Sequence, residues 1–219
     1  MKKIVSNLKF NDKHQLVCKG KNGRFCPVFK KQGSLDGACA TYSVIMNLLI
    51  LSLISDSDTL WNAKHKTKEI KKLFKVFCND NGMHRGGQTF HKITKMLRSS
   101  FGNVIDVQHT ATKCSEWDTI DMIVSVVNKM KIPVIMSISD GNEWGHAMLV
   151  VGYEKEKDTI TRLFCLDPSG DYIHGNKRWN ASIDIKKERK NPFAYISSLE
   201  GKKLKRYVYL EDIMILTRL

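Results

Sequence analysis

Cys39 differs from the other five cysteines of the chain in its sequence surroundings. It follows a glycine-rich turn and a potential helix cap, Asp36, and it lies at the start of a long apolar segment. If Asp36 is the N-cap, Cys39 takes the third helical position, where unpaired backbone N–H groups and the helix dipole favour negative charge. The pKa of a cysteine at such a helix start can fall to about 3.5–7.5. The spacing predicts a thiolate nucleophile, although Cys39 taken alone fits a buried structural cysteine better.

Three polar residues elsewhere in the chain fit a reaction at this thiol. Gln32 precedes Cys39 by seven residues, so that its amide and the Cys39 backbone N–H can hold an oxyanion. His146 opens an apolar strand, where an imidazole can serve as acid and base for the thiol. Asp167 ends the next strand and, if the two strands pair, it holds the other nitrogen of His146. Taken singly, His146 fits a structural histidine and Asp167 fits a turn residue before proline. Together with Cys39 and Gln32, they predict thiol-dependent acyl transfer.

Helices in the first part of the chain must position Cys39. The segment 38–54 is apolar on nearly every face, which is typical of a helix in the core. Hydrophobic periodicity and capping residues predict three more helices. The expected helices are 38–54, an amphipathic helix capped by Asp58–Thr59, about 88–100, and one that starts at the capping signal Ser115–Asp118 and ends near Met130.

Strands in the second part must position His146 and Asp167. From Pro133 onward the pattern changes to β-branched and apolar runs separated by turn residues. The expected strands are 133–138, 146–153, 160–166, 207–210 and 213–216, with earlier ones at 16–18, 25–29 and 104–107. Helices followed by strands predict an α+β architecture. We expect one domain over 1–219, with a mainly helical lobe at 1–130 and a mainly sheet lobe at 131–219.

Composition narrows the classes of protein that the chain can represent. Hydrophobic residues make up 42% and charged residues 26%, as in a folded globular domain. The longest apolar stretch, Val44–Ile54, is well short of the about 20 residues of a membrane-spanning helix, so no membrane insertion is expected. The start of the chain carries no secretory signal, and we expect a cytoplasmic protein or an effector delivered by another route.

The net charge of +14 comes from 36 lysines and arginines against 22 acidic residues. Basic runs at 64–72, 186–190 and 202–206 favour an acidic protein partner, although a solvated lysine-rich surface is the plainer interpretation. No nucleic-acid-binding motif accompanies them. Cys18 and Cys26 can face each other across a hairpin as half of a zinc site, but no second pair completes it. We therefore expect neither a metal nor a cofactor.

The order Gln, Cys, His, Asp resembles the papain-like cysteine peptidases. The residues that carry the resemblance are Gln32–Tyr42 and Gly145–Gly152. Locally they look most like the staphopain group of bacterial peptidases, whereas the Asp-Pro at Asp167 is more similar to the bacteriocin leader peptidases. The resemblance implies a bacterial thiol protease with a papain-like fold, Cys39 on a central buried helix and a Cys-His-Asp triad with a glutamine oxyanion hole. Two departures are Ala38, where an aromatic residue or serine is common, and Asp167 in place of asparagine.

The resemblance leaves the substrate and the exact reaction open. We expect a protein or peptide substrate, with Trp144 either lining the cleft or shielding the imidazole. Gly86 and Gly87 are expected to allow close approach of an extended substrate backbone. The same triad also serves a deamidase or a transglutaminase. A third alternative is an inactive papain-like module that binds partners through its basic surface.

Overall fold

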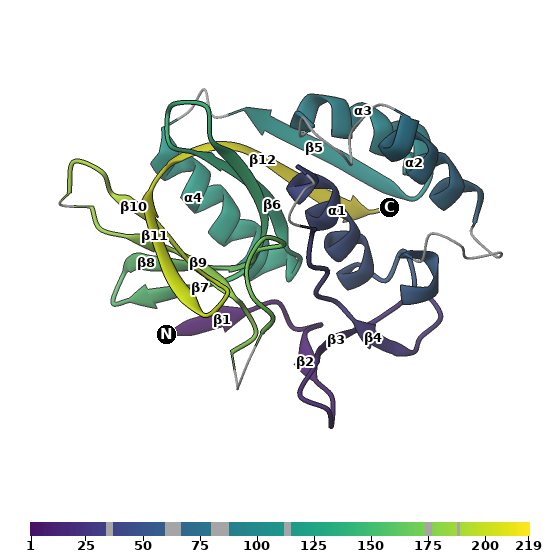
Figure 1. Ribbon diagram of the computed structural model, residues 1–219, viewed down its shortest axis with the longest axis horizontal. Helices are drawn as coiled ribbons and strands as arrows, with labels where there is room; N and C mark the ends of the chain where they lie inside the picture. The colour runs from purple at the N-terminus through teal and green to yellow at the C-terminus, as the bar shows by residue number, and fades with distance from the viewer. Residues whose placement is uncertain (34–36, 60–66, 80–87, 112–114, 174–176, 188) are drawn as a thin grey trace.

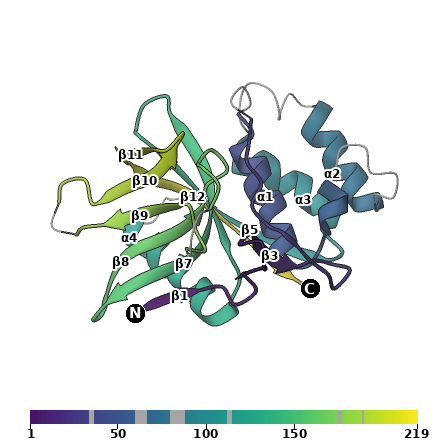
Figure 2. The same cartoon turned by 60° about the horizontal axis from the view of Figure 1, so that its bottom comes forward.

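The computed structural model describes residues 1–33, 37–59, 67–79, 88–111, 115–173, 177–187 and 189–219. Figures 1 and 2 show helices α1, α2 and α3 gathered beside a large curved sheet. The expected α+β, papain-like fold is confirmed. The helices are α1 (Cys39–Ile50), the 3-10 turn η1 (Asp56–Thr59), α2 (Lys68–Asn79), α3 (Phe90–Phe101), α4 (Glu116–Ser125) and the π-helical turn η2 (Val126–Met130).

The core helix α1 is buried on nearly every side, as its apolar sequence predicts. It ends at Ile50 rather than at residue 54. Leu51 is its C-cap, and Ser52 takes a left-handed backbone conformation with φ of 57°, which turns the chain out of the helix. The expected helix thus extends four residues too far at its C-terminal end, because the apolar run continues beyond the turn.

Two of the expected helix starts are confirmed and one is wrong. The Thr89 hydroxyl accepts from Lys92 N at 3.3 Å before α3, and the Ser115 hydroxyl accepts from Asp118 N at 3.2 Å before α4. Asp58, in contrast, lies within η1, where its carboxylate accepts from Ser55 N at 2.7 Å; the helix that carries Ile70 begins at Lys68, and the Thr67 hydroxyl accepts from Ile70 N at 3.4 Å. Residues 60–66 lie outside the described residues.

The main sheet is antiparallel throughout and has the strand order β11-β10-β9-β8-β7-β6-β12-β5, with β1 added alongside β7. A separate small sheet has the order β2-β3-β4. The strands are β1 (Lys2–Ile4), β2 (Lys9–Phe10), β3 (Leu16–Lys19), β4 (Phe25–Pro27), β5 (Ile105–Ala111), β6 (Val134–Ser139), β7 (Gly145–Glu156), β8 (Thr159–Leu166), β9 (Ala181–Ile185), β10 (Phe193–Leu199), β11 (Lys202–Tyr207) and β12 (Tyr209–Arg218).

Most expected strands are confirmed within a few residues, but the end of the chain differs. Strands β9, β10 and β11 were not expected from the sequence. The two late strands expected at 207–210 and 213–216 are one strand, β12, whose pairing with β6 shifts by one residue between Leu210 and Ile213. This irregularity is a β-bulge, in which two residues on one strand oppose one on its partner.

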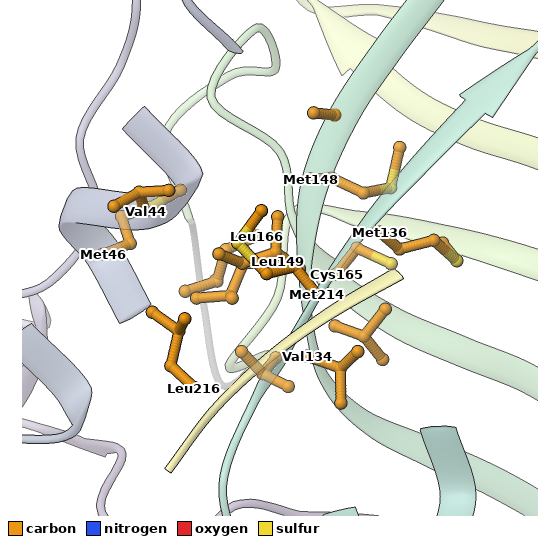
Figure 3. Close-up of a cluster of buried hydrophobic side chains, with 14 of the residues drawn as sticks. Val44, Met46, Val134, Met136, Met148, Leu149, Cys165, Leu166, Met214 and Leu216 are labelled. Carbon is orange, nitrogen blue, oxygen red and sulfur yellow. The ribbon is translucent and has the colours of Figure 1, made fainter. Parts of the chain in front are cut away.

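The main hydrophobic core lies between α1 and the central strands (Figure 3). In this view Val44 and Met46 of α1 lie on the side of β7 where Leu149 and Leu166 are found, whereas Met136 and Met148 lie toward the other side; all belong to the buried core cluster. These side chains are buried, so they fix the helix start relative to the strand ends. Helix α4 packs instead against β7 and β12 and lies with the strands, apart from α1–α3 (Figure 2).

None of the helices in the described parts of the chain combines the length and the apolar character needed to cross a bilayer. The longest described helices have 12 residues, against about 20 for a span.

Candidate active site

Cys39 is the first residue of α1 and lies at the edge of the main core. Ala38 is the N-cap, so Cys39 takes the first helical position and not the third, and the expected cap Asp36 lies outside the described residues. The N-terminal dipole of the helix still acts on the sulfur, because its effect extends over the first turn. The sulfur accepts a backbone hydrogen bond from Ala147 N at 3.3 Å. The helix start is therefore held against the strand that carries His146.

His146 and Asp167 are brought together by the pairing of β7 with β8, as the sequence predicts. His146 is the second residue of β7, and Asp167 directly follows β8. The His146 Nε2 atom lies 2.7 Å from Asp167 Oδ1, and both residues are buried. Because Nε2 is held by the carboxylate, Nδ1 is the nitrogen that remains for the thiol.

The thiol and the imidazole share a hydrogen bond, and their pKa values move in opposite directions. Burial raises the pKa of Cys39, but the hydrogen bond and charge of His146, together with backbone N–H groups, outweigh it and bring this pKa below its ordinary value. Burial lowers the pKa of His146, but its hydrogen bonds to Asp167 and Cys39 raise this pKa to about 10. At neutral pH these shifts favour a thiolate–imidazolium pair.

Asp167 is held by more donors than His146 alone. Its Oδ1 also accepts from Ser169 N at 2.8 Å, while Oδ2 accepts from the hydroxyls of Tyr195 and of Ser197, the latter at 2.9 Å. Burial alone would raise the pKa of Asp167; the His146 hydrogen bond and charge and the other donors keep it below its ordinary value. The carboxylate therefore stays ionised although it is fully buried.

The residues that fix Asp167 were missed by sequence reasoning. Tyr195 and Ser197 lie on β10, which was not expected to be a strand. The one usable signal in the sequence is the run Phe193–Ile196, which holds two aromatic residues and one β-branched residue, as is typical of a strand. Asn180 was also missed: its side chain accepts from Asp167 N and donates to Asp167 O, both at 2.8 Å.

Gly170 lies where these supporting groups converge. A Cβ atom at this position would lie 2.8 Å from Asn180 Nδ2 and 2.9 Å from Ser197 Oγ. We predict that Gly170→Ala lowers kcat by about 10- to 100-fold, because Asp167 and hence His146 lose their orientation. Kinetics on a peptide substrate would show the loss. An unchanged kcat in a Gly170→Ala protein that unfolds at the wild-type temperature would contradict the prediction.

Cys39 and His146 open into a cavity of about 620 Å³ between the two halves of the molecule. Gln32 lines it, and its backbone N–H donates to Pro168 O at 2.9 Å, which anchors the glutamine beside the Asp167 turn. Trp144 lines the cavity as well and stacks on His146, with ring centroids 5.8 Å apart. The tryptophan therefore both borders the cleft and shields the imidazole. Gly86 and Gly87, expected to contact the substrate, lie outside the described residues.

Cys18 and Cys26 face each other directly across the β3–β4 hairpin, and both thiols are free. Within the described residues, no group of three or more cysteine, histidine, aspartate or glutamate side chains is arranged to hold a metal ion. The cysteine pair thus has no partners there that would complete a zinc site.

The fold and the site geometry together are those of a papain-like cysteine peptidase. The model of the Peptidase_C39 like family matches residues 28–197, which is 170 of the 219 residues and includes Gln32, Cys39, His146 and Asp167. The chain belongs to this family. A comparison with curated proteins found no match.

Proposed function

We propose that the protein hydrolyses peptide bonds in protein or peptide substrates, with Cys39 as nucleophile. In this proposal His146 is the general acid and base, Asp167 orients it, and Gln32 helps to hold the oxyanion. The observation that carries the proposal is the continuous chain of hydrogen bonds from the Cys39 sulfur through His146 to Asp167. This chain lies at the wall of an open cavity that can admit a polypeptide.

The reaction follows from the ionised pair. The Cys39 thiolate attacks the scissile carbonyl carbon and forms a C–S bond, while the carbonyl oxygen becomes an oxyanion. The His146 imidazolium gives its proton to the leaving amine as the C–N bond breaks, which leaves a thioester. Neutral His146 then takes a proton from water, and the resulting hydroxide attacks the thioester. The C–S bond breaks, the acid product leaves, and the thiolate–imidazolium pair is restored.

Gln32 is expected to stabilise the oxyanion together with backbone N–H groups at the start of α1. We predict that Gln32→Ala lowers kcat by about 10²–10³-fold with little change in KM, because the lost hydrogen bond is stronger in the transition state than in the ground state. Steady-state kinetics would separate the two constants. Gln15→Ala, an exposed glutamine next to β3, is the control. A rise in KM without a fall in kcat would assign Gln32 to substrate binding instead.

The basic surface supports an acidic protein as the substrate or partner. Lys202, Lys203, Lys205 and Arg206 lie on the edge strand β11, which is exposed at every position. Electrostatic attraction of this kind acts over the Debye length, about 10 Å at 0.1 M salt. Association with such a partner should therefore weaken steeply between low and moderate salt.

A comparison of cellular protein N-termini tests the reaction itself. Cells that express the wild type should contain new N-termini that are absent with Cys39→Ala. New N-termini in equal numbers in both samples would refute peptidase activity. A deamidase or transglutaminase would instead leave backbones intact and change glutamine side chains, by about 1 Da for deamidation, which mass spectrometry detects in the same samples. We also propose a relationship to the staphopain group and to the bacteriocin leader peptidases. The aspartate at position 167 supports the relationship to the leader peptidases.

A further inference from the structure

Gln88 presents a buried amide to the cavity that contains Cys39. It lies two residues before α3, and its side chain is among those that line the cavity. Both polar atoms of this side chain, Oε1 and Nε2, are buried, and neither has a hydrogen-bond partner among the residues that the structure describes. A buried amide without partners is unfavourable, because it has given up its hydrogen bonds to water and gained none in return. The two atoms are therefore available for a ligand that brings both a donor and an acceptor into the cleft.

The opposite wall of the same cavity carries two carboxylates, placed there by the bulge in β12. Tyr209 and Leu210 pair with Ser139 and Ile138, and pairing resumes at Ile213 with Met136. Two residues, Glu211 and Asp212, thus oppose the single residue Ser137. All three line the cavity. A bulge of this kind redirects side chains that a regular strand would point to opposite faces.

Ring contacts and hydrogen bonds connect the two walls. The Phe90 ring, at the start of α3, packs against His109 with centroids 6.0 Å apart. His109 Nε2 lies 3.1 Å from Asp212 Oδ2, and Asp212 N donates to Ser137 Oγ at 2.9 Å. Gln88 and the bulge therefore belong to one compartment, which we call the Gln88–Asp212 subsite and which consists of Gln88, Phe90, Ser137, Glu211 and Asp212.

The charge of this cavity is opposite to that of the whole chain. Glu143, Glu211 and Asp212 line it, and none of its described lining residues is a lysine or arginine, although the chain carries +14. Glu143 and Glu211 form no ion pair within the described residues; Glu211 hydrogen-bonds to the Ser139 hydroxyl. The nearby cation Arg206 is directed to Asp140, at 3.3 Å, and to the face of Trp144. Its charge is therefore already engaged outside the subsite.

We infer that the Gln88–Asp212 subsite binds a lysine or arginine side chain of the substrate, close to the bond that is cut. The inference rests on the proposed function in so far as it names a substrate. The cationic head group donates to the Glu211 and Asp212 carboxylates and to Gln88 Oε1, while its methylene stem packs on Phe90. Gln88 Nε2 donates to a carbonyl of the extended substrate backbone, so both buried amide atoms gain partners.

Peptide series with single substitutions test the specificity. Each position within three residues of the cleaved bond carries lysine, arginine, glutamine or norleucine in turn, and kcat/KM is measured. We expect a basic residue to be preferred over glutamine at one position by about tenfold or more in the wild type. Glu211→Gln should reduce this ratio by about fivefold, which corresponds to one partly exposed ion pair of about 1 kcal/mol. The glutamine keeps a hydrogen bond to Ser139, so that the change isolates the charge.

A matched control and an independent readout complete the test. Glu156→Gln removes an exposed carboxylate ten residues along β7 from His146, and it should leave the ratio unchanged. Protection of Cys39 from iodoacetamide by the same peptides reports binding without turnover, and lysine peptides should protect better than glutamine peptides. Gln88→Ala should weaken the protection by peptides of both kinds, because it loses the backbone contact.

The outcomes separate the inference from the proposed function. Peptide cleavage without a basic preference, or a preference that Glu211→Gln and Asp212→Asn both leave intact, would overturn the subsite. The absence of cleavage together with selective protection by lysine peptides would refute the peptidase and support the subsite. The absence of both cleavage and selective protection would overturn both.

Discussion

Replacing Cys39 with alanine is expected to lower kcat/KM for a cleaved peptide by at least about 10⁴-fold. Without the sulfur no acyl-enzyme forms, and the oxyanion site and substrate binding alone give only a small residual rate. The free energy of unfolding should change little, because the substitution removes a single sulfur atom from a partly buried side chain at the edge of the core. Hydrolysis of a fluorogenic peptide, with thermal unfolding as the check on folding, measures both quantities.

The matched control for this substitution is Cys26→Ala. Cys26 lies on β4 in the small sheet, is not among the residues that line the catalytic cavity, and its thiol is nearly fully buried. Its removal should leave the rate within about twofold. If Cys39→Ala retained more than a hundredth of the wild-type rate, with contamination excluded by a second purification, the nucleophile would have to be sought elsewhere.

Replacing Asp167 with alanine is expected to have the second largest effect, on both activity and stability. The change removes the acceptor for His146 Nε2, Ser169 N and the hydroxyls of Tyr195 and Ser197. Each buried donor without a partner costs about 1–3 kcal/mol, partly relieved by relaxation. We expect a loss of about 3 kcal/mol in the free energy of unfolding and a fall of about 10³-fold in kcat/KM, because His146 loses its tautomer and orientation.

Asp167→Asn separates orientation from charge. The amide oxygen can still accept from His146 Nε2, and the hydroxyls of Tyr195 and Ser197 can rotate to accept from the amide nitrogen. Activity should therefore lie between those of the wild type and of Asp167→Ala. The negative charge that helps to raise the pKa of His146 to about 10 is lost, so the alkaline limit of activity should move to lower pH. An alkaline limit unchanged from the wild type would show that Asp167 does not control the imidazole. Urea denaturation and the pH profile of kcat/KM provide the measurements.

The parts of the fold that could be predicted from the sequence are those with a strong local signal. Helix α1 is apolar on nearly all faces, α4 has its Ser115 cap, and β7 and β8 contain the apolar runs Ala147–Val151 and Leu163–Leu166. Because these elements position Cys39, His146 and Asp167, the grouping of these three residues in one site could be predicted as well. The position of Cys39 in the helix, first rather than third, could not be predicted, since the choice of cap depends on how the turn packs and not on the residue types alone.

The support around Asp167 and the far wall of the cleft could not be predicted, because they depend on pairing between distant segments. Strand β11 is exposed at every position and so has no hydrophobic alternation. Tyr195 and Ser197 reach Asp167 only because β9 and β10 extend the sheet from β8. Glu211 and Asp212 enter the cavity only because β12 is bulged there, and a one-residue shift in register changes which side chains share a face.

The pH dependence of Cys39 alkylation tests most directly whether His146 activates the sulfur. The rate of iodoacetamide labelling at Cys39, located by mass spectrometry, is measured between pH 4 and 10 in the wild type and in His146→Ala. An ordinary cysteine thiol has a pKa of about 8.5. The account predicts a wild-type midpoint well below this value, because the imidazolium stabilises the thiolate, and a midpoint at or above it in His146→Ala, where burial of the thiol remains. Equal midpoints in the two proteins, or a wild-type midpoint at or above the ordinary value, would contradict it.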